Sequence, residues 1–216
     1  MRPSRVVIEG GLITDCMIVS NYIYGSGAQG GGGVYAGFYN NAAYLAVIRN
    51  SLIAYNRAAV SYGGGLIVRF GQLLVQNCTI VSNYATSTAG GAYLDYAAGH
   101  GPGIIENTII YYNSSDGTIS NWISGAGEAF FTNSCAAPLT GMGGANNTDA
   151  NPLFVSRDGG NFRLTRESLC INTGVNRGWM LHALDLGGHC RLDRFSGIVD
   201  MGCYEYVPGG AVFTIK

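Results

Sequence analysis

One eight-residue pattern recurs four times along this chain, and each copy closes on an asparagine. The copies occupy residues 14–21, 49–56, 76–83 and 106–113, and they align without gaps. Their closing asparagines are 35, 27 and 30 residues apart. Self-similarity at a period of about thirty residues is the signature of a solenoid, in which each repeat packs only on its neighbours.

Two further short patterns accompany the first. A Gly-led apolar segment follows each of the first three copies, at residues 33–38, 65–70 and 91–96. A second apolar segment precedes the next asparagine, at residues 46–48, 73–75 and 103–105. Three short strands per period, separated by Gly and Asn, describe one coil of a parallel β-helix. A β-sandwich is the alternative, but its strands do not repeat the same residues in register.

We therefore predict an all-β fold, a single-stranded right-handed parallel β-helix with three short strands per coil and a C-terminal cap. Residues 1–130 would form the coils. Residues 131–216 would form the last coil or coils and the cap, within the same structural domain. The composition agrees, because 34 glycines and 14 tyrosines beside only 5 prolines are typical of a turn-rich β protein.

The alignment also predicts which side chains stack. Ile18, Ile53, Ile80 and Ile110 share one position, so in successive coils they would point inward about 4.8 Å apart, the spacing of paired strands. The Asp or Asn three residues earlier would occupy a corner, because Asn tolerates a left-handed backbone and can hydrogen-bond to the next coil. Glycine runs at residues 30–33, 63–65 and 90–91 mark another corner, where we expect positive φ.

Cys16 and Cys78 occupy the same inward position two coils apart, with Ser51 between them. Their separation of roughly 9–10 Å exceeds the reach of a disulfide, so we expect two free, inert thiols that fill the core. The chain has no CxxC pair and its three histidines stand apart. We therefore predict no zinc site, no other metal and no cofactor.

The charge pattern excludes several classes of protein. Twelve basic and 13 acidic residues give a net charge of −1, and charged residues make up only 12% of the chain. A disordered or nucleic-acid-binding protein is therefore not expected. No apolar stretch is long enough for a signal peptide or a membrane span. We expect either an intracellular protein or a piece of a longer chain.

Candidate chemistry is confined to exposed strand positions. Stacking the Gly-led segments puts Gly37, Arg69 and Asp95 in one column. There, Arg69 and Asp95 are either a cross-strand ion pair or weak candidates for catalysis. A second column lacks the clustered carboxylates of a calcium site. It contains Thr14, Arg49, Gln76 and Glu106.

Tyr35, Tyr93 and Tyr96 lie on the Gly-led segments. Tyrosine rings on a flat β face can stack against sugar rings, and they pack equally well on one another as a ladder. We take these three residues as weak candidates for carbohydrate binding, and the ladder interpretation stays open beside it.

The last third of the chain carries a different series of motifs, which includes NPLF at residues 151–154 and MGCYEY at residues 201–206. This series resembles the closing segment of bacterial right-handed parallel β-helix proteins with a choice-of-anchor Q domain. Those proteins are similar in architecture to pectate-lyase-like and polymorphic outer-membrane-protein repeats. The resemblance covers about residues 130–206 and implies a secreted or surface-attached bacterial protein. Because the chain shows no export signal or hydrophobic anchor, we expect it to be a fragment.

The resemblance also implies disulfides. Similar proteins often carry cysteines where Cys135 and Cys170 fall, which implies a bridge between these two. Cys190 and Cys203 both replace small residues or proline, and this shared departure suggests a second bridge that closes a short loop.

We expect the last third to cover the end of the solenoid, since an exposed sheet edge promotes aggregation. Residues 162–164 would add one more strand. The loops of Asp185 and Asp200 would fold over the end, with Asp200 as a turn-holding carboxylate in preference to a catalytic one. No comparable cap precedes Val6, so we expect an open N-terminal coil that a second copy or missing residues would cover.

These observations favour a non-catalytic secreted or cell-surface module, adhesin-like or spacer-like, with weak binding to polysaccharide. The alternative is a carbohydrate-active enzyme, a polysaccharide lyase or glycoside hydrolase, on the same scaffold. A third hypothesis is a structural unit that self-associates through its N-terminal coil. An enzyme would need acids and an arginine clustered in one cleft, whereas the columns show isolated charges.

Overall fold

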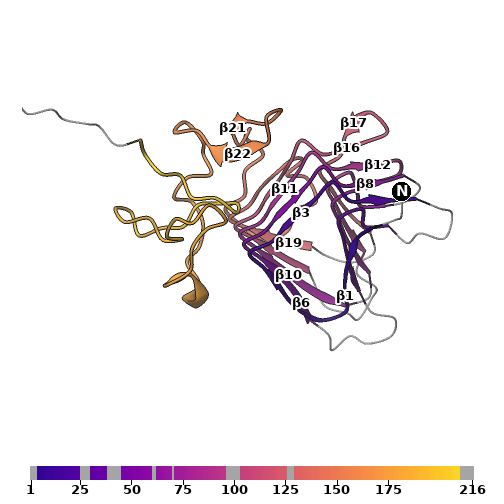
Figure 1. The fold of residues 1–216 in the computed structure, drawn as a ribbon, viewed down its shortest axis with the longest axis horizontal. Helices are drawn as coiled ribbons and strands as arrows, with labels where there is room; N and C mark the ends of the chain where they lie inside the picture. Colours follow the sequence, from indigo (N-terminus) through magenta and orange to yellow (C-terminus); the bar gives the residue numbers. More distant parts are fainter. Residues whose placement is uncertain are drawn as a thin grey trace, which may run out of the picture.

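The structure is a computed structural model that describes residues 4–24, 30–37, 45–59, 62–69, 71–95, 103–125 and 129–209. It is an all-β parallel solenoid of about four turns. The successive coils stack along one direction, and the orange and yellow C-terminal part of the chain lies beside them (Figure 1).

Corresponding strands of successive coils form the sheets of the solenoid. Sheet A consists of β1 (Val6–Ile8), β5 (Val34–Gly37), β9 (Leu66–Arg69), β13 (Ala92–Asp95) and β18 (Trp122–Ser124). Sheet B consists of β2 (Gly11–Thr14), β6 (Leu45–Arg49), β10 (Gln72–Gln76), β14 (Gly103–Glu106) and β19 (Ala129–Thr132). Sheet C consists of β3 (Met17–Val19), β7 (Leu52–Ala54), β11 (Thr79–Val81), β15 (Ile109–Tyr111) and β20 (Cys135–Ala136). These are the three strands per coil that the repeat predicts.

A fourth sheet, which we did not predict, follows the closing asparagines. Sheet D consists of the two-residue strands β4 (Tyr22–Ile23), β8 (Arg57–Ala58), β12 (Tyr84–Ala85), β16 (Ser114–Ser115) and β17 (Thr118–Ile119). All of its pairs are parallel except that of β16 with β17. Two residues are too few to show the alternation by which a strand is recognised in sequence.

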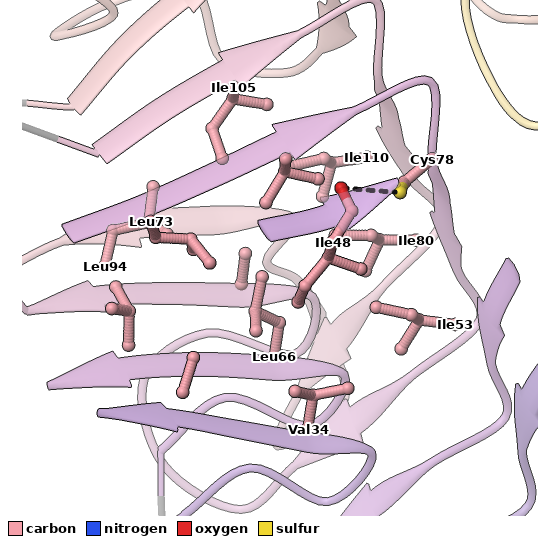
Figure 2. Packing of buried hydrophobic residues seen from close by; sticks show 14 of the residues in the cluster. Val34, Ile48, Ile53, Leu66, Leu73, Cys78, Ile80, Leu94, Ile105 and Ile110 are labelled. Atoms are coloured by element: carbon pink, nitrogen blue, oxygen red, sulfur yellow. Dashed lines mark hydrogen bonds between the residues drawn. The ribbon is translucent and has the colours of Figure 1, made fainter. Parts of the chain in front are cut away.

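The predicted register is confirmed. Ile18 pairs with Ile53, Ile53 with Ile80, and Ile80 with Ile110. All four side chains are buried in one apolar core, and Figure 2 shows Ile53, Ile80 and Ile110 following one another from coil to coil. Full burial of an isoleucine contributes about 2 kcal/mol, so such a column strongly disfavours a shift in register.

The closing asparagines form a second internal column, and their amides link the coils. The backbone N–H and Nδ2 of Asn56 both donate to Oδ1 of Asn83, at 2.9 and 3.0 Å. Asn83 donates in the same way to Asn113, and Asn21 to Asn56. Because Asn56, Asn83 and Asn113 are almost fully buried, losing one amide would leave several buried polar groups unpaired.

The two corners differ in physical origin. Asp15, Asn50, Asn77 and Asn107 have φ between 48° and 55°, which confirms the predicted left-handed corner. In the glycine runs, positive φ is confined to Gly30, Gly31 and Gly63. The predicted positive φ is therefore wrong for the other glycines of these runs. They lack a side chain for a different reason, which is that neighbouring coils approach them closely. A Cβ on Gly32, for example, would lie 2.4 Å from the carbonyl oxygen of Gly64.

Residues 139–150 cover the end of the solenoid that the last coil would otherwise expose. The N–H of Phe131 donates to the carbonyl of Gly143 at 3.0 Å, and the N–H of Thr148 donates to that of Ser134 at 2.9 Å. Isolated bridges join Phe130 to Gly143 and Cys135 to Thr148. These backbone contacts satisfy groups on an edge that would otherwise be open to pairing.

The rest of the C-terminal third lies along the side of the solenoid, so our expectation for the Asp185 and Asp200 loops was wrong. The carbonyl of Asp200 accepts from Asn77 in the third coil, and that of Leu184 accepts from Asn50 in the second. The physical reason is the outer face of sheet C, whose apolar side chains need a cover. Leu52, Val81, Ile109 and Cys135 are buried there against Phe162, Leu164, Cys170, Met201 and Cys203.

The segment 162–164 also departs from the prediction. It belongs to β22 (Asn161–Leu164), which pairs antiparallel with β21 (Phe154–Ser156) and adds no strand to the coils. The short 3-10 helix η1 (Gly178–Met180) lies further along residues 151–209, the part of the chain beside sheet C, which we call the flanking segment. The hairpin packs its Phe154 and Phe162 rings against each other, 5.4 Å apart.

Candidate functional site

The predicted site residues lie on the outer face of sheet A. Tyr35 pairs with Ile67 and Ile67 with Tyr93, so these three side chains form one outward column. Two residues further along the strands, Gly37 pairs with Arg69 and Arg69 with Asp95. The sequence alignment had predicted this second column.

Arg69 and Asp95 form a cross-strand ion pair. Nε of Arg69 lies 3.3 Å from Oδ2 of Asp95, and both side chains remain about a quarter exposed. A pair that is open to water contributes at most about 1 kcal/mol to stability.

The ring of Tyr93 stacks on that of Tyr62, with centroids 5.0 Å apart and planes 21° from parallel. Burial, with a smaller contribution from the Asp95 carboxylate, raises the pKa of Tyr93, so its hydroxyl stays protonated. Tyr62 is 39% exposed. We refer to Tyr62, Tyr93, Arg69 and Asp95 as the tyrosine platform.

The sequence did not point to Tyr62, because it lies outside the repeated segments. It directly precedes the run that begins at Gly63, whose φ of 66° lets the chain reverse direction. The one signal in the sequence that could have identified Tyr62 is its position as an aromatic residue beside a glycine corner. Its partner ring, that of Tyr93, lies in the next coil.

Gly125 borders the platform in the coil that follows. A Cβ at this position would lie 2.6 Å from Oδ1 of Asp95 and 3.0 Å from the hydroxyl of Tyr93. Glycine therefore allows the backbone to approach both side chains closely.

The other two tyrosine candidates are placed differently. Tyr35 is only 8% exposed, and the guanidinium of Arg5 lies 4.8 Å from its ring centroid. The same Arg5 donates from Nη1 to the carbonyl of Gly30 at 2.6 Å. This cover leaves little of the Tyr35 ring open to a ligand. Tyr96 lies outside the residues that the structure describes.

The second polar column forms as predicted and is bound by the flanking segment. Arg49 donates to Gln76 at 3.3 Å, and Gln76 donates to Glu106 at 2.9 Å. Arg177 of the flanking segment donates from Nε and Nη2 to the carboxylate of Glu106, which is almost fully buried. Trp179 lies under Arg49, 4.6 Å from ring centroid to guanidinium. This column therefore fastens the flanking segment to the coils.

The carboxylate of Asp200 accepts backbone hydrogen bonds, but these link separate parts of the chain and do not hold the turn at Met201 and Gly202 that we predicted. Its Oδ1 accepts from the N–H of Asn172 at 2.7 Å, and its Oδ2 accepts from that of Tyr206 at 2.6 Å. Asp185 has the same role, because it accepts from the backbone N–H groups of Gly187, His189 and Glu205. These carboxylates are occupied by backbone hydrogen bonds.

The structure corrects the disulfide predictions, because all six cysteines are free. Cys135 and Cys170 lie in one buried cluster as free thiols, and the Cys135 thiol donates to the carbonyl of Ala150 at 3.2 Å. The neighbouring Cys170 thiol, together with burial, raises the pKa of Cys135. Cys190 and Cys203 do not form the predicted bridge either. Cys190 is exposed to solvent, whereas Cys203 is fully buried beside Thr79.

Cys16 and Cys78 lie in one column with Ser51 and Thr108. The N–H of Cys16 donates to the Ser51 hydroxyl at 3.1 Å, and that of Cys78 donates to the Thr108 hydroxyl at 3.2 Å. Burial raises the pKa of Cys78 to about 12, which keeps it a thiol at neutral pH. Cys78 therefore lacks the thiolate character that makes a cysteine reactive.

Within the described part of the chain, no three His, Cys, Asp or Glu side chains are arranged to hold a metal ion. The described residues also include no helix long and apolar enough to cross a membrane. No protein-family model matches the chain, and no curated protein is significantly similar to it in sequence. The conclusions about function therefore rest on the geometry above.

Proposed function

We propose that this chain is a non-catalytic β-solenoid module, adhesin-like or spacer-like, that binds carbohydrate weakly through the tyrosine platform. One observation carries the non-catalytic part. Two pairs join acids of the coils to basic side chains, Arg69 with Asp95 within the coils and Arg177 of the flanking segment with Glu106.

The stacked rings of Tyr62 and Tyr93 support the carbohydrate-binding part. Partly exposed aromatic rings offer an apolar face to the C–H groups of a sugar, and the polar atoms of Arg69 and Asp95 beside them can hydrogen-bond to hydroxyl groups. The platform is small and neutral overall, which favours weak binding of an uncharged sugar over tight binding of a polyanion.

The secreted or surface location in a bacterium is part of the same proposal. It rests on the resemblance of residues 130–206 to choice-of-anchor Q β-helix proteins. A rigid stack of hydrogen-bonded coils suits a spacer, because each coil is fixed to the next by the Asn56, Asn83 and Asn113 amides.

The test is a glycan array combined with a panel of uronate polysaccharides, with absorbance monitored for unsaturated products. We expect weak, saturable binding without turnover, lost in Tyr93→Ala and Tyr62→Ala. A matched control is Tyr24→Ala, since Tyr24 stacks on Tyr22 in the same way, with centroids 5.6 Å apart, at the end of β4. Turnover that Arg69→Ala abolishes would instead establish the enzyme hypothesis.

A further inference from the structure

A cleft of about 350 Å³ opens within the flanking segment, separate in its residues from the tyrosine platform. Its walls are apolar and aromatic. They include Leu192, Phe195, Tyr206, Val207 and Pro208. The volume is at the lower end of the range found for small-molecule sites, and it suits a compact ligand.

The loop that carries Phe195 is fixed in place although the ring is 91% exposed. Oδ1 of Asp193 accepts from the N–H of Phe195 at 2.8 Å and from that of Ser196 at 2.5 Å. Asn176 donates to the carbonyl of Gly197 at 2.6 Å. A large apolar ring held in water by a rigid loop is preorganised for contact, because little conformational entropy remains to be lost on binding.

Glu205 lines the cleft, and only 5% of its surface is exposed. Its Oε2 accepts from the N–H of Asp200 at 3.1 Å. Its Oε1 lies 3.2 Å from Nη2 of Arg191 but makes no hydrogen bond. The ion pair with Arg191 offsets part of the cost of burying this carboxylate, and the two further acids beside it, Asp185 and Asp200, leave negative charge that a cationic ligand would offset.

The charges around Glu205 are predominantly acidic. Asp185 and Asp200 lie beside it, whereas fully buried Arg191 forms an ion pair with Glu205 and also interacts with Asp200. At the rim, the charges of Asp193 and Arg194 offset each other. His189 also lines the cleft and lies 3.6 Å from Asp185. Above pH 8, where Glu205 is also ionised, the cleft and its floor carry two more negative than positive charges.

We propose that this cleft binds a quaternary ammonium group on a small apolar body. The rings of Phe195 and Tyr206 would contact the ammonium through their negative faces, and the Glu205 carboxylate would supply the counter-charge. A quaternary ammonium needs no hydrogen-bond acceptor, so it suits a carboxyl that lies in the floor and not at the surface. The apolar walls would cover the remainder of the ligand. This site is independent of the tyrosine platform and of the function proposed for it.

The test is calorimetric titration of the full chain with choline, compared with 3,3-dimethyl-1-butanol, its uncharged analogue of the same shape. We expect choline to bind with saturation at least tenfold more tightly than the alcohol. Phe195→Ala should weaken choline binding at least fivefold, and it should fold normally because the ring is exposed. Leu181→Ala is the matched control, because Leu181 is 66% exposed on the flanking segment and does not line the cleft. It should bind choline as the parent chain does.

The pH dependence gives a second readout. Burial raises the pKa of Glu205 to about 8, so most of the carboxyl is protonated at pH 7. Choline does not titrate, and its affinity should therefore rise roughly tenfold from pH 7 to pH 9, an increase that Glu205→Gln removes. Absence of saturable choline binding would overturn the proposal, as would equal binding of the alcohol or affinities unchanged by both Phe195→Ala and Glu205→Gln.

Discussion

The side-chain amide of Asn77 donates a hydrogen bond to the backbone carbonyl of Asp200 at 3.1 Å, although the two residues are 123 positions apart. Asn77 owes its position to the left-handed corner of the third coil, where φ is 49°. The corner asparagines therefore serve two purposes. They turn the chain within each coil, and their side chains bind the flanking segment, as Asn107 does with the carbonyl of Val175.

Asn77→Gly should destabilise the protein by about 2–4 kcal/mol. Glycine keeps the backbone conformation, so the loss reports the side-chain hydrogen bonds to Asp200 and from Asn107. Urea unfolding measures it. Asn146→Gly is the matched control, since Asn146 is exposed with φ of 58°, and it should change stability by less than about 0.5 kcal/mol. Equal effects of the two substitutions would show that the Asn77 side chain does not fasten the segment.

Arg177→Ala should cost about 2–3 kcal/mol, because it leaves the buried Glu106 carboxylate without its cation. Arg166→Ala provides the comparison. Arg166 pairs with Glu167 at the surface, where both side chains are more than half exposed, and its loss should be close to neutral. Hydrogen exchange should also show faster opening of residues 173–184 in the first variant alone. Unchanged exchange there would argue against the fastening role.

Stability should fall as pH rises from 5 to 9. Burial raises the pKa of Asp200 to about 6 and that of Glu205 to about 8, above their ordinary values of 3.8 and 4.5. The folded state therefore holds protons that the unfolded state has released, and this stabilisation is lost as pH passes through the folded values. We expect a loss of about 2 kcal/mol or more in urea unfolding. Glu205→Gln should flatten the upper part of the curve, and a free energy of unfolding that rises over this range would contradict the assignment.

Thiol labelling should distinguish the cysteines by position. Cys190 is exposed and should react first with an alkylating reagent in the native protein, followed by the partly buried Cys16. Cys78 and Cys203 should react only on unfolding, because both are fully buried and burial raises the pKa of each thiol to about 12. Mass spectrometry of peptides measures the order. Native Cys190 that resists labelling until a reductant is added would restore the bridge to Cys203, which the shared departure of these two cysteines from the family pattern had suggested.

The strands of the solenoid and their pairing could be predicted from the sequence, because each coil needs apolar residues at the same inward positions and Asp or Asn at the same corner. An inward isoleucine three residues after a left-handed Asp or Asn recurs in four successive coils, so aligning Ile18 with Ile53 gives the strand pairing directly. The column of Arg69 and Asp95 followed from the same alignment. An alignment of repeats therefore predicts contacts between residues that occupy the same position in successive coils.

The features that were missed involve residues that face something other than a copy of themselves. Tyr62 stacks on Tyr93 across coils from outside the repeated segments. Phe162 and Cys203 pack on sheet C because its outer face is apolar, a contact between segments without shared periodicity. The cleft beside Phe195 depends on loop geometry set by Asp193, which no repeat encodes.

The central claim is that equivalent side chains of successive coils stack in one column. Methyl–methyl nuclear Overhauser spectroscopy on isoleucine-labelled protein tests it most directly. We predict strong cross-peaks for Ile18 with Ile53, Ile53 with Ile80, and Ile80 with Ile110, and none between Ile18 and Ile110. A spectrum in which these neighbours show no contact, or in which Ile18 and Ile110 share one, would contradict the stacked coils.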